Sequence, residues 1–455
     1  MAIFEGYFRR FSWPIALATF ALILIGITAI WTVERAGETD AAGCTARQAA
    51  FAVAGLFLFF AATVVDYRRV GQGSYALFGL TLVLLVVVLF LPGIKGSRRW
   101  IPLIPGLFQF QPSELAKLTF IVALAWYLRY RNSYRRLAGM IVPFALTLVP
   151  LGLILREPDL GTSMLLLPTL MVMLLVAGAR WRHLLVILAL GAAVVFLPVP
   201  RLVDGQQFAR QIDPNCYDAR ALGPFVRYKP KEFRRDNGTI DWYKRPVTPV
   251  AYMRFQMGEG PVFDLQPLSV VAITMKGHGY QLDRIESWLR QNDPRIRGAA
   301  GFQQYNSMLM LGAGRTGGQR DRQAMDEYLR LVPEDHNDFI FSVVGARWGF
   351  AGCMAVMMLY GIIALFGVDV ATSTGDAFGR LLAVGVVALL AAQVFINVAM
   401  TVGMMPITGM TLPLVSYGGS SLLVNCLALG LLVNVGRRRP ISLAPPPFEF
   451  GGDNI

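Results

Sequence analysis

The sequence predicts an all-α membrane protein that crosses the bilayer many times. Of its 455 residues, 55% are hydrophobic and only 16% are charged, and the mean hydropathy is +0.50. Soluble domains carry about 25% charged residues, whereas one helical span requires roughly 20 mostly apolar residues. Apolar runs of that length recur along almost the whole chain. Together with an uneven distribution of arginine, they indicate about ten transmembrane helices with a large extracytoplasmic loop between the seventh and the eighth.

Ten apolar runs are the candidates for these spans. They cover residues 13–33, 48–65, 74–92, 112–129, 139–156, 159–178, 182–200, 339–367, 381–403 and 416–435. A further apolar piece at 261–275 is short and is interrupted by Asp264 and Pro267. We expect this piece to lie at the membrane interface.

Arginine predicts the orientation of the spans, because cytoplasmic loops carry an excess of Lys and Arg. If the N-terminus is cytoplasmic, one side collects Arg9, Arg10, Arg68, Arg69, Arg129, Arg131, Arg135, Arg136, Arg180, Arg182, Arg380 and Arg437 to Arg439. Both termini are then cytoplasmic. The net charge of +13 follows from this topology, and the sequence contains no nucleic-acid-binding module.

The topology divides the chain into four segments. Residues 1–200 hold spans one to seven, and residues 201–338 form the extracytoplasmic loop. Residues 339–436 hold spans eight to ten, and residues 437–455 form a cytoplasmic tail.

Ionisable side chains gather at the extracytoplasmic ends of several spans, where they are costly and usually functional. Glu114 and Lys117 lie at i and i+3, so they share one helix face. REPDLGTS at 156–163 supplies further charges, and Arg47 opens the second span. Pro and Gly interrupt the helical pattern at 406–419, which is tolerated at membrane depth where the backbone lines a cavity. This pattern predicts a polar cavity that opens outward; a structural ion pair and a snorkelling arginine are the alternative.

Metal and redox sites are weakly indicated. The three histidines are scattered and form no ligand spacing. PEDHND at 333–338 could bind a divalent ion, or its acids could favour the N-terminus of the eighth span. Cys44 and Cys216 both fall outside the membrane centre, and a disulfide between them stays open.

Six motifs occur in order along the chain. They are GSRRWIPL…FQFQPSELAKL (96–118), EPDLGTS (157–163), YQLDRI (280–285), NDPRIRGAAGFQQYNS (292–307), LVPEDHNDFIFSVVG (331–345) and GMTLPLVSYGGSS (409–421). With these motifs the chain resembles the SEDS family (shape, elongation, division and sporulation), whose members include RodA and FtsW. The resemblance spans nearly the whole chain except residues 203–276. It divides the loop into an insertion at 203–276 and a catalytic stretch at 280–338.

The resemblance implies ten spans in the bacterial cytoplasmic membrane and a glycosyltransferase that polymerises lipid II at its outer face. It implies a class B penicillin-binding protein as partner, a transpeptidase that cross-links the undecaprenyl-linked glycan once it is made. It implies no certain cofactor and leaves a divalent cation, Mg or Mn, open.

The resemblance places the essential acid of the family at Asp293. A carboxylate there would act as general base and take the proton of the acceptor sugar hydroxyl, with inversion at the donor sugar. Arg295 and Arg297 would stabilise the leaving pyrophosphate. The candidate substrate-binding residues are Arg47, Glu114, Lys117, Asp159, Arg295, Arg297, Asn306 and Ser416. From spacing alone, Asp293 before Pro294 is also typical of a turn.

The chain departs from the family pattern at several positions. Glu157 stands where an amide is usual, and Asn306 replaces a glutamine. Ala346 and Arg347 replace paired acids, and Arg315 replaces a glycine. These changes bear on partner contacts and on pocket detail.

Two other functions remain open from the sequence. A flippase that moves lipid II without chemistry would also need an outward polar cavity, although it has no obvious need for a base in an outer loop. A non-catalytic scaffold for a transpeptidase would fit the replaced acids. The insertion at 203–276 is either a solvated segment or a docking segment.

Overall fold

The computed structural model describes residues 11–36, 43–91, 99–104, 108–131, 136–157, 159–196, 198–203, 262–267, 284, 288, 301–319, 321, 329 and 337–438. The chain forms two compact units. One comprises Met1–His183 and Gln303–Ile455, and the other comprises Leu184–Phe302. In the second unit, β3 (Pro198–Val203) and β4 (Val262–Pro267) pair as a two-stranded antiparallel sheet. In the sequence, β3 follows helix α9 (Trp181–Phe196).

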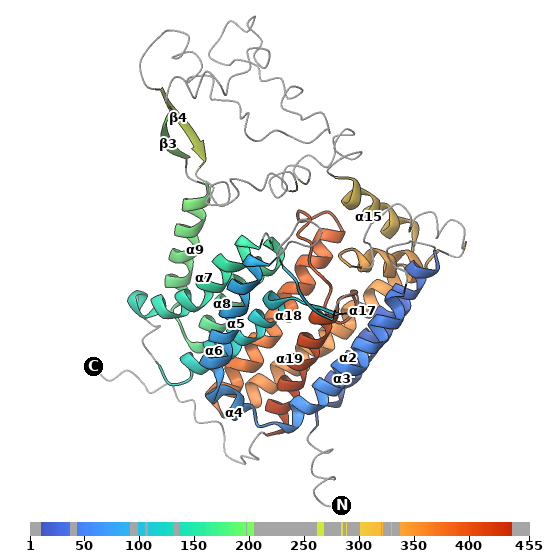
Figure 1. Cartoon of the computed structure of the whole chain (residues 1–455), viewed down its shortest axis with the longest axis horizontal. Helices are drawn as coiled ribbons and strands as arrows, with labels where there is room; N and C mark the ends of the chain where they lie inside the picture. Colours follow the sequence, from blue (N-terminus) through green and yellow to red (C-terminus); the bar gives the residue numbers. More distant parts are fainter. Residues whose placement is uncertain are drawn as a thin grey trace, which may run out of the picture. The chain divides into compact units, whose positions relative to one another are not determined.

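The first unit is a bundle of helices packed side by side (Figure 1). The long helices of the bundle are α2 (Trp13–Arg35), α3 (Cys44–Val64), α5 (Ser74–Phe90), α6 (Pro112–Leu128), α7 (Ile141–Arg156), α8 (Leu160–Ala177), α17 (Ile340–Ser373), α18 (Ala377–Thr401) and α19 (Gly419–Arg437). Shorter elements are α4 (Tyr67–Gln72), η3 (Leu137–Met140), α15 (Phe302–Ala313) and the hairpin of β1 (Ile101–Ile104) and β2 (Phe108–Phe110).

The helical fold class is confirmed, and a helix overlaps each of the ten apolar runs. Within the described residues, six helices are long and apolar enough to cross a membrane: α2, α3, α8, α17, α18 and α19. Helices α5 and α7 are apolar but shorter. The run expected at 182–200 ends as a helix at Phe196, and part of the expected interfacial piece 261–275 forms β4. The bundle also exposes large apolar side chains such as Phe57 (72%) and Leu365 (71%). An apolar surface of this kind is more favourable in lipid than in water.

Aspartates cap three of the helices in the bundle. Asp66, Asp159 and Asp376 precede α4, α8 and α18, and each carboxylate accepts a backbone N–H from the first turn, at 3.0 to 3.1 Å. Such caps satisfy amide groups that a helix cannot pair internally. They fix where these helices begin.

Close backbone contacts hold α3 against α19. A Cβ at Gly430 of α19 would overlap the backbone of Phe59 in α3. Glycine at this position lets the two helices approach closely, as small residues do in membrane bundles. The second and the last long helices of the bundle, α3 and α19, therefore share one interface, and Figure 1 shows the bundle that they belong to.

Helix α17 is kinked at Gly349, whose φ is 67°. The amides of Phe350 and Ala351 leave the helical ladder and donate to the carbonyls of Arg315 and Thr316, at 2.8 and 3.1 Å. Arg315, one of the departures from the family pattern, has a φ of 49°. A glycine would adopt this conformation at lower cost.

Candidate functional site

Asp159 anchors a buried group of polar side chains where α6 and α8 begin. Only 3% of Asp159 is exposed. Its carboxylate accepts hydrogen bonds from Gln111 Nε2 (3.0 Å), Ser113 Oγ (3.3 Å), Thr162 Oγ1 (2.8 Å) and the Thr162 amide (3.1 Å). Four donors leave this carboxylate well satisfied despite its burial. They also join the start of α6 to the start of α8.

Glu114 and Lys117, in the first two turns of α6, form a buried ion pair. The Lys117 ammonium lies 2.9 Å from each oxygen of Glu114. Glu114 is 5% exposed and Lys117 is 2% exposed. A pair this deeply buried loses most of its hydration, so it adds little to stability compared with apolar side chains. The predicted i, i+3 pairing is present, and we refer to Gln111, Ser113, Glu114, Lys117, Asp159 and Thr162 as the α6–α8 polar cluster.

Ser420, in the first turn of α19, extends the α6–α8 polar cluster to a third helix. Its hydroxyl donates to the carbonyl of Gln109 at 2.9 Å and accepts the amide of Gln111 at 3.1 Å. Gln111 therefore contacts Ser420 through its backbone and Asp159 through its side chain. The β1–β2 hairpin, which leads into α6, is held against α19 by these bonds.

Ser416 lies in the non-helical segment before α19 and is 4% exposed. Its hydroxyl accepts the amide of Leu412 at 2.8 Å. Its carbonyl accepts Gln48 Nε2 at 3.1 Å, and Gln48 Oε1 accepts the amide of Gly418 at 3.3 Å. Gln48 of α3 thus fixes the backbone on both sides of Tyr417.

Arg47 lies in the first turn of α3 and is exposed. Its side chain interacts with the hydroxyl of Tyr417. Cys44, in the same turn, is buried. Cys216, its possible disulfide partner, lies outside the described residues.

Glu157 occupies the turn between α7 and α8, two residues before Asp159. It has no exposed surface, and neither carboxyl oxygen has a hydrogen-bond partner. Burial and, to a smaller extent, the negative charge of Asp159 raise the pKa of Glu157, Arg99 lowers it, and the net value is about 9. Glu157 is therefore protonated at neutral pH. A neutral carboxyl with one donor and one acceptor resembles the amide that is usual at this position.

The other predicted site residues lie elsewhere or outside the described residues. Asn306 is buried in α15. Its neighbours tie α15 to the end of α18, because Gln304 Nε2 and the Ser307 hydroxyl donate to the carbonyls of Met400 and Thr401 at 3.0 and 3.1 Å. The candidate catalytic Asp293, with Arg295 and Arg297, lies outside the described residues.

Sequence reasoning missed the neutral polar members of the site. Three of them lie in the first turn of a helix: Ser113, Thr162 and Ser420. A hydroxyl side chain at such a position is usually interpreted as a capping residue. Gln48 was also missed, although a buried amide in an apolar run is itself a signal. Within the described part of the chain, no group of three His, Cys, Asp or Glu side chains could hold a metal ion.

Comparisons with known proteins place this arrangement in one family. The profile of the FtsW/RodA/SpoVE family, described as "Cell cycle protein", matches residues 10–213 and 261–440. A peptidoglycan glycosyltransferase RodA of Treponema pallidum is 29% identical over 94% of this chain and 98% of its own length. The stage V sporulation protein E of Bacillus subtilis is 29% identical over 92% and 94%.

Solved structures agree with the sequence matches. A chain from a peptidoglycan synthase complex, described as coordinating polymerization and crosslinking, matches with a TM-score of 0.66 and 27% identity, over 95% of this chain and 99% of that one. The rod shape determining protein RodA of Thermus thermophilus matches with a TM-score of 0.57 and 25% identity, over 94% and 97%. The chain is a multi-pass membrane protein that belongs to the FtsW/RodA/SpoVE family of cell cycle proteins, and the resemblance to the SEDS family is confirmed.

Proposed function

We propose that this chain is a peptidoglycan glycosyltransferase that polymerises lipid II into glycan strands at the outer face of the bacterial cytoplasmic membrane. The observation that carries the proposal is the α6–α8 polar cluster, which holds three buried charged side chains, Glu114, Lys117 and Asp159, inside an apolar bundle. Such groups are expensive in a membrane and mark substrate sites. Relatives named peptidoglycan glycosyltransferase align over nearly the full length of the chain.

The proposed topology has ten spans with both termini in the cytoplasm. The arginine-rich ends of the helices then face the cytoplasm, and residues 201–338 lie outside. In this orientation the α6–α8 polar cluster lies at the outer ends of α6 and α8, on the side of the membrane where the proposal places Asp293. The proposed division of the chain is the one that the sequence predicts: spans one to seven in 1–200, the outer loop in 201–338, spans eight to ten in 339–436 and a cytoplasmic tail in 437–455.

The proposed reaction joins the 4-hydroxyl of an acceptor GlcNAc to C1 of a donor MurNAc. Asp293 accepts the proton of the hydroxyl while the new C–O bond forms, because a sugar hydroxyl is a weak nucleophile. The bond from C1 to the lipid pyrophosphate breaks at the same time, which inverts the configuration at C1. The electron pair leaves with the pyrophosphate.

Cations stabilise the charge that develops on the leaving pyrophosphate. Arg295 and Arg297 lie beside Asp293 in the sequence, and Arg47 is exposed at the start of α3. Lys117 is held by Glu114 within the α6–α8 polar cluster. Asp159 and Ser416 position the surrounding backbone, and Asn306 belongs to α15, which lies within the catalytic stretch 280–338. A divalent cation at the pyrophosphate stays open.

The proposed partner is a class B penicillin-binding protein, which would cross-link the strands as they are made. The match to a chain of a peptidoglycan synthase complex supports an assembly of this kind. A lipid II flippase is the alternative function, because buried charges in a bundle also suit transport. A non-catalytic scaffold would show neither activity.

One experiment separates these functions. Purified full-length chain, alone and with its transpeptidase, is incubated with labelled lipid II, and glycan products are resolved on a gel. The same preparation in liposomes is tested for movement of fluorescent lipid II between leaflets. Glycan ladders without leaflet exchange support the polymerase. Exchange without ladders would establish the flippase, and neither activity would leave the scaffold.

A further inference from the structure

The segment between α18 and α19, residues 402–418, is non-helical and packs tightly inside the bundle. A Cβ at Gly26 of α2 would lie 2.5 Å from the carbonyl oxygen of Val415, so this helix contacts the backbone of the segment directly. Val415 has no exposed surface. The hydroxyl of Tyr360 in α17 donates to the carbonyl of Pro413. Buried backbone needs partners of this kind, and here they come from helices far away in the sequence.

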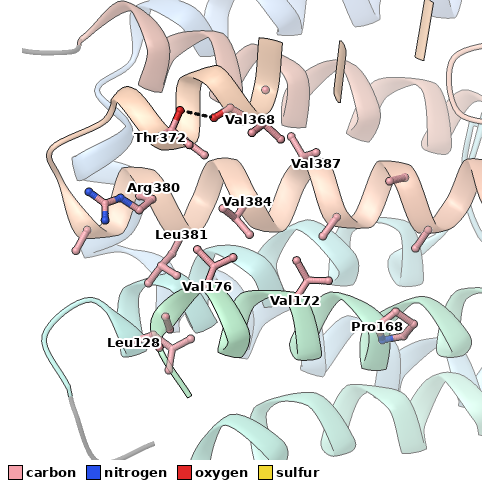
Figure 2. A pocket seen from close by; sticks show the side chains of 18 of the residues that line it. Leu128, Pro168, Val172, Val176, Val368, Thr372, Arg380, Leu381, Val384 and Val387 are labelled. Carbon is pink, nitrogen blue, oxygen red and sulfur yellow. Dashed lines mark hydrogen bonds between the residues drawn. The ribbon is translucent and has the colours of Figure 1, made fainter. Parts of the chain in front are cut away.

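Helix α18 holds the same segment with one of its two faces. Gln393 and Asn397 are buried, and their side-chain amides donate to the carbonyls of Thr411 and Met410 at 3.1 and 2.6 Å. The opposite face of α18, which includes Val384, lines an apolar pocket (Figure 2). Polar contacts from α17 and α18 therefore fix the backbone that leads to Tyr417.

The first turn of α3 holds Tyr417 by its backbone and by its side chain. Gln48 bonds the backbone on both sides of Tyr417, at 3.1 and 3.3 Å. The Tyr417 hydroxyl forms hydrogen bonds with the side chains of Arg47 and Cys44. A guanidinium can only donate, so the hydroxyl accepts the bond from Arg47. Cys44 and Arg47 lie three residues apart and so share one face of α3.

The two partners of the Arg47–Tyr417 hydrogen bond differ in their freedom to move. Tyr417 is half-buried, and the bonds to Gln48 fix its backbone. Arg47 is exposed, and a long arginine side chain that is free in solvent samples many rotamers. The hydrogen bond therefore orients Arg47, because Tyr417 is already in place. Binding costs less when the side chain that makes the contact is ordered beforehand.

Arg47 and Tyr417 lie at the start of α19, as does one contact of the α6–α8 polar cluster. Tyr417 precedes Ser420 by three residues, and Ser420 bonds the backbone of Gln109 and Gln111. In the proposed topology this end of α19 faces outward, on the side where the proposal places the chemistry.

We propose that Tyr417 is a positioning residue, which orients the Arg47 guanidinium to bind the pyrophosphate of the lipid-linked substrate. This inference rests on the function proposed above and assigns a specific contact to the pyrophosphate. Arginine matches phosphate oxygens through two parallel N–H donors. The guanidinium has more N–H groups than the bond to one hydroxyl uses, so its remaining donors can bind phosphate while Tyr417 holds it.

Binding without turnover tests the orientation of Arg47. The full-length chain in nanodiscs of phosphatidylcholine is titrated with undecaprenyl pyrophosphate and, separately, with undecaprenol, which has the same chain and no phosphate. Tyr417→Phe keeps the ring and removes the hydroxyl. We expect this variant to bind the pyrophosphate roughly three- to tenfold more weakly and undecaprenol as wild type does. Unchanged pyrophosphate binding in Tyr417→Phe, or no preference of wild type for the pyrophosphate, would overturn the proposal.

A double-mutant cycle shows whether Tyr417 acts through Arg47. Arg47→Gln should weaken pyrophosphate binding, and Tyr417→Phe should then cost nothing further in that background. Losses that add in the double variant would mean that Tyr417 contributes independently of Arg47, and they would overturn the positioning role.

Tyr360→Phe is the matched control, because it removes another hydroxyl that bonds the same segment, at Pro413. This variant should lower the melting temperature and keep the preference for undecaprenyl pyrophosphate over undecaprenol. An equal loss of preference in Tyr360→Phe and Tyr417→Phe would show that the packing of the segment sets the affinity, and it would overturn the assignment to Tyr417.

Steady-state polymerisation of lipid II by the chain with its transpeptidase gives a second readout. Tyr417→Phe should raise KM more than it lowers kcat, because the hydroxyl acts on substrate binding. A merely structural defect reduces the amount of active chain, which lowers the apparent kcat at unchanged KM, and this result would contradict the proposal.

The inference and the proposed function fail in different ways. Glycan products together with additive losses in the cycle would contradict only the role of Tyr417. Pyrophosphate binding with a non-additive cycle, but without glycan products from wild type, would support the role of Tyr417 and contradict only the proposed polymerase.

Discussion

Two ion pairs in this bundle have nearly the same geometry and very different surroundings. Lys117 and Glu114 lie 2.9 Å apart, with 2% and 7% of their side chains exposed. Arg438 and Asp66 lie 3.1 Å apart, with 31% and 30% exposed. The first pair belongs to the α6–α8 polar cluster, and the second joins the end of α3 to the end of α19.

The difference in exposure separates a pair that water screens from a pair whose burial is costly. At the partly exposed end, Arg438 also donates to the carbonyl of Val64 at 2.9 Å, and Asp66 caps α4. Water screens this pair, which contributes roughly 0–1 kcal/mol. The buried pair loses hydration that apolar side chains would not lose. Stability alone therefore does not account for a charged pair at this depth, and we infer the substrate-binding role proposed above.

Breaking the buried pair should have the largest effect. Lys117→Ala leaves the Glu114 carboxylate buried without its cation, which should lower the free energy of unfolding by about 3–5 kcal/mol. Unfolding in mixed detergent micelles measures the change. The double variant Glu114→Gln with Lys117→Met should recover most of the stability but not lipid II polymerisation. A double variant as active as wild type would mean that the pair is only structural.

Asp159 should be the next most sensitive position. Asp159→Asn keeps the size of the side chain but replaces one carboxylate oxygen with an NH2 group, so some of the four donors then face another donor. We expect a loss of about 1–3 kcal/mol, the penalty for buried polar groups left unpaired. Ser113→Ala is the matched control, because it removes one donor and leaves three, and its cost should be about 1 kcal/mol. Equal costs for the two variants would contradict the central place of Asp159.

The raised pKa of Glu157 predicts that the stability of the chain depends on pH. Its pKa is about 9 in the folded chain, against 4.5 for an ordinary glutamate. The unfolded chain therefore loses this proton first, so stability falls progressively as pH rises from about 4.5 to about 9, by at most about 1.4 kcal/mol per pH unit. Glu157→Gln should remove this slope. Melting temperatures at pH 6 and pH 8 measure it, and parallel wild-type and variant curves would show that Glu157 is not protonated.

The smallest effect is expected at the partly exposed pair. Asp66→Asn removes the charge opposite Arg438 but still caps α4, since asparagine is as good a cap as aspartate. We expect a loss of about 0–1 kcal/mol that shrinks in high salt. Unfolding with and without added salt measures it. A cost as large as that of Lys117→Ala would mean that exposure does not distinguish the two pairs.

The sequence predicts the helices well because each apolar run must satisfy its backbone within the membrane. Helices α5 and α6 begin at the expected residues 74 and 112. The expected eighth span stops at 367, six residues before α17 ends, because the polar Asp369 and Ser373 continue the helix beyond the apolar run. The pairing of β3 with β4 was not predicted, since strand pairing between residues about 60 apart leaves no local signal in the sequence.

The site is predictable only where its partners are close in the sequence. The i, i+3 spacing of Glu114 and Lys117 predicts their contact, and the pair is present. Gln111 meets Asp159 across 48 residues, and Ser420 meets Gln109 across 311 residues. These contacts depend on how α6, α8 and α19 pack. Asp293 lies outside the described residues, and its role stays a prediction.

The most direct test of the proposed function is the polymerisation of labelled lipid II by the purified chain with its transpeptidase, comparing wild type with Asp293→Asn and Asp293→Ala. Co-purification of the partner and an unchanged melting temperature serve as controls for folding. We predict glycan ladders for wild type and none for either variant, because neither side chain can accept the proton of the acceptor hydroxyl. Ladders of normal length from Asp293→Asn would contradict a general base at this position.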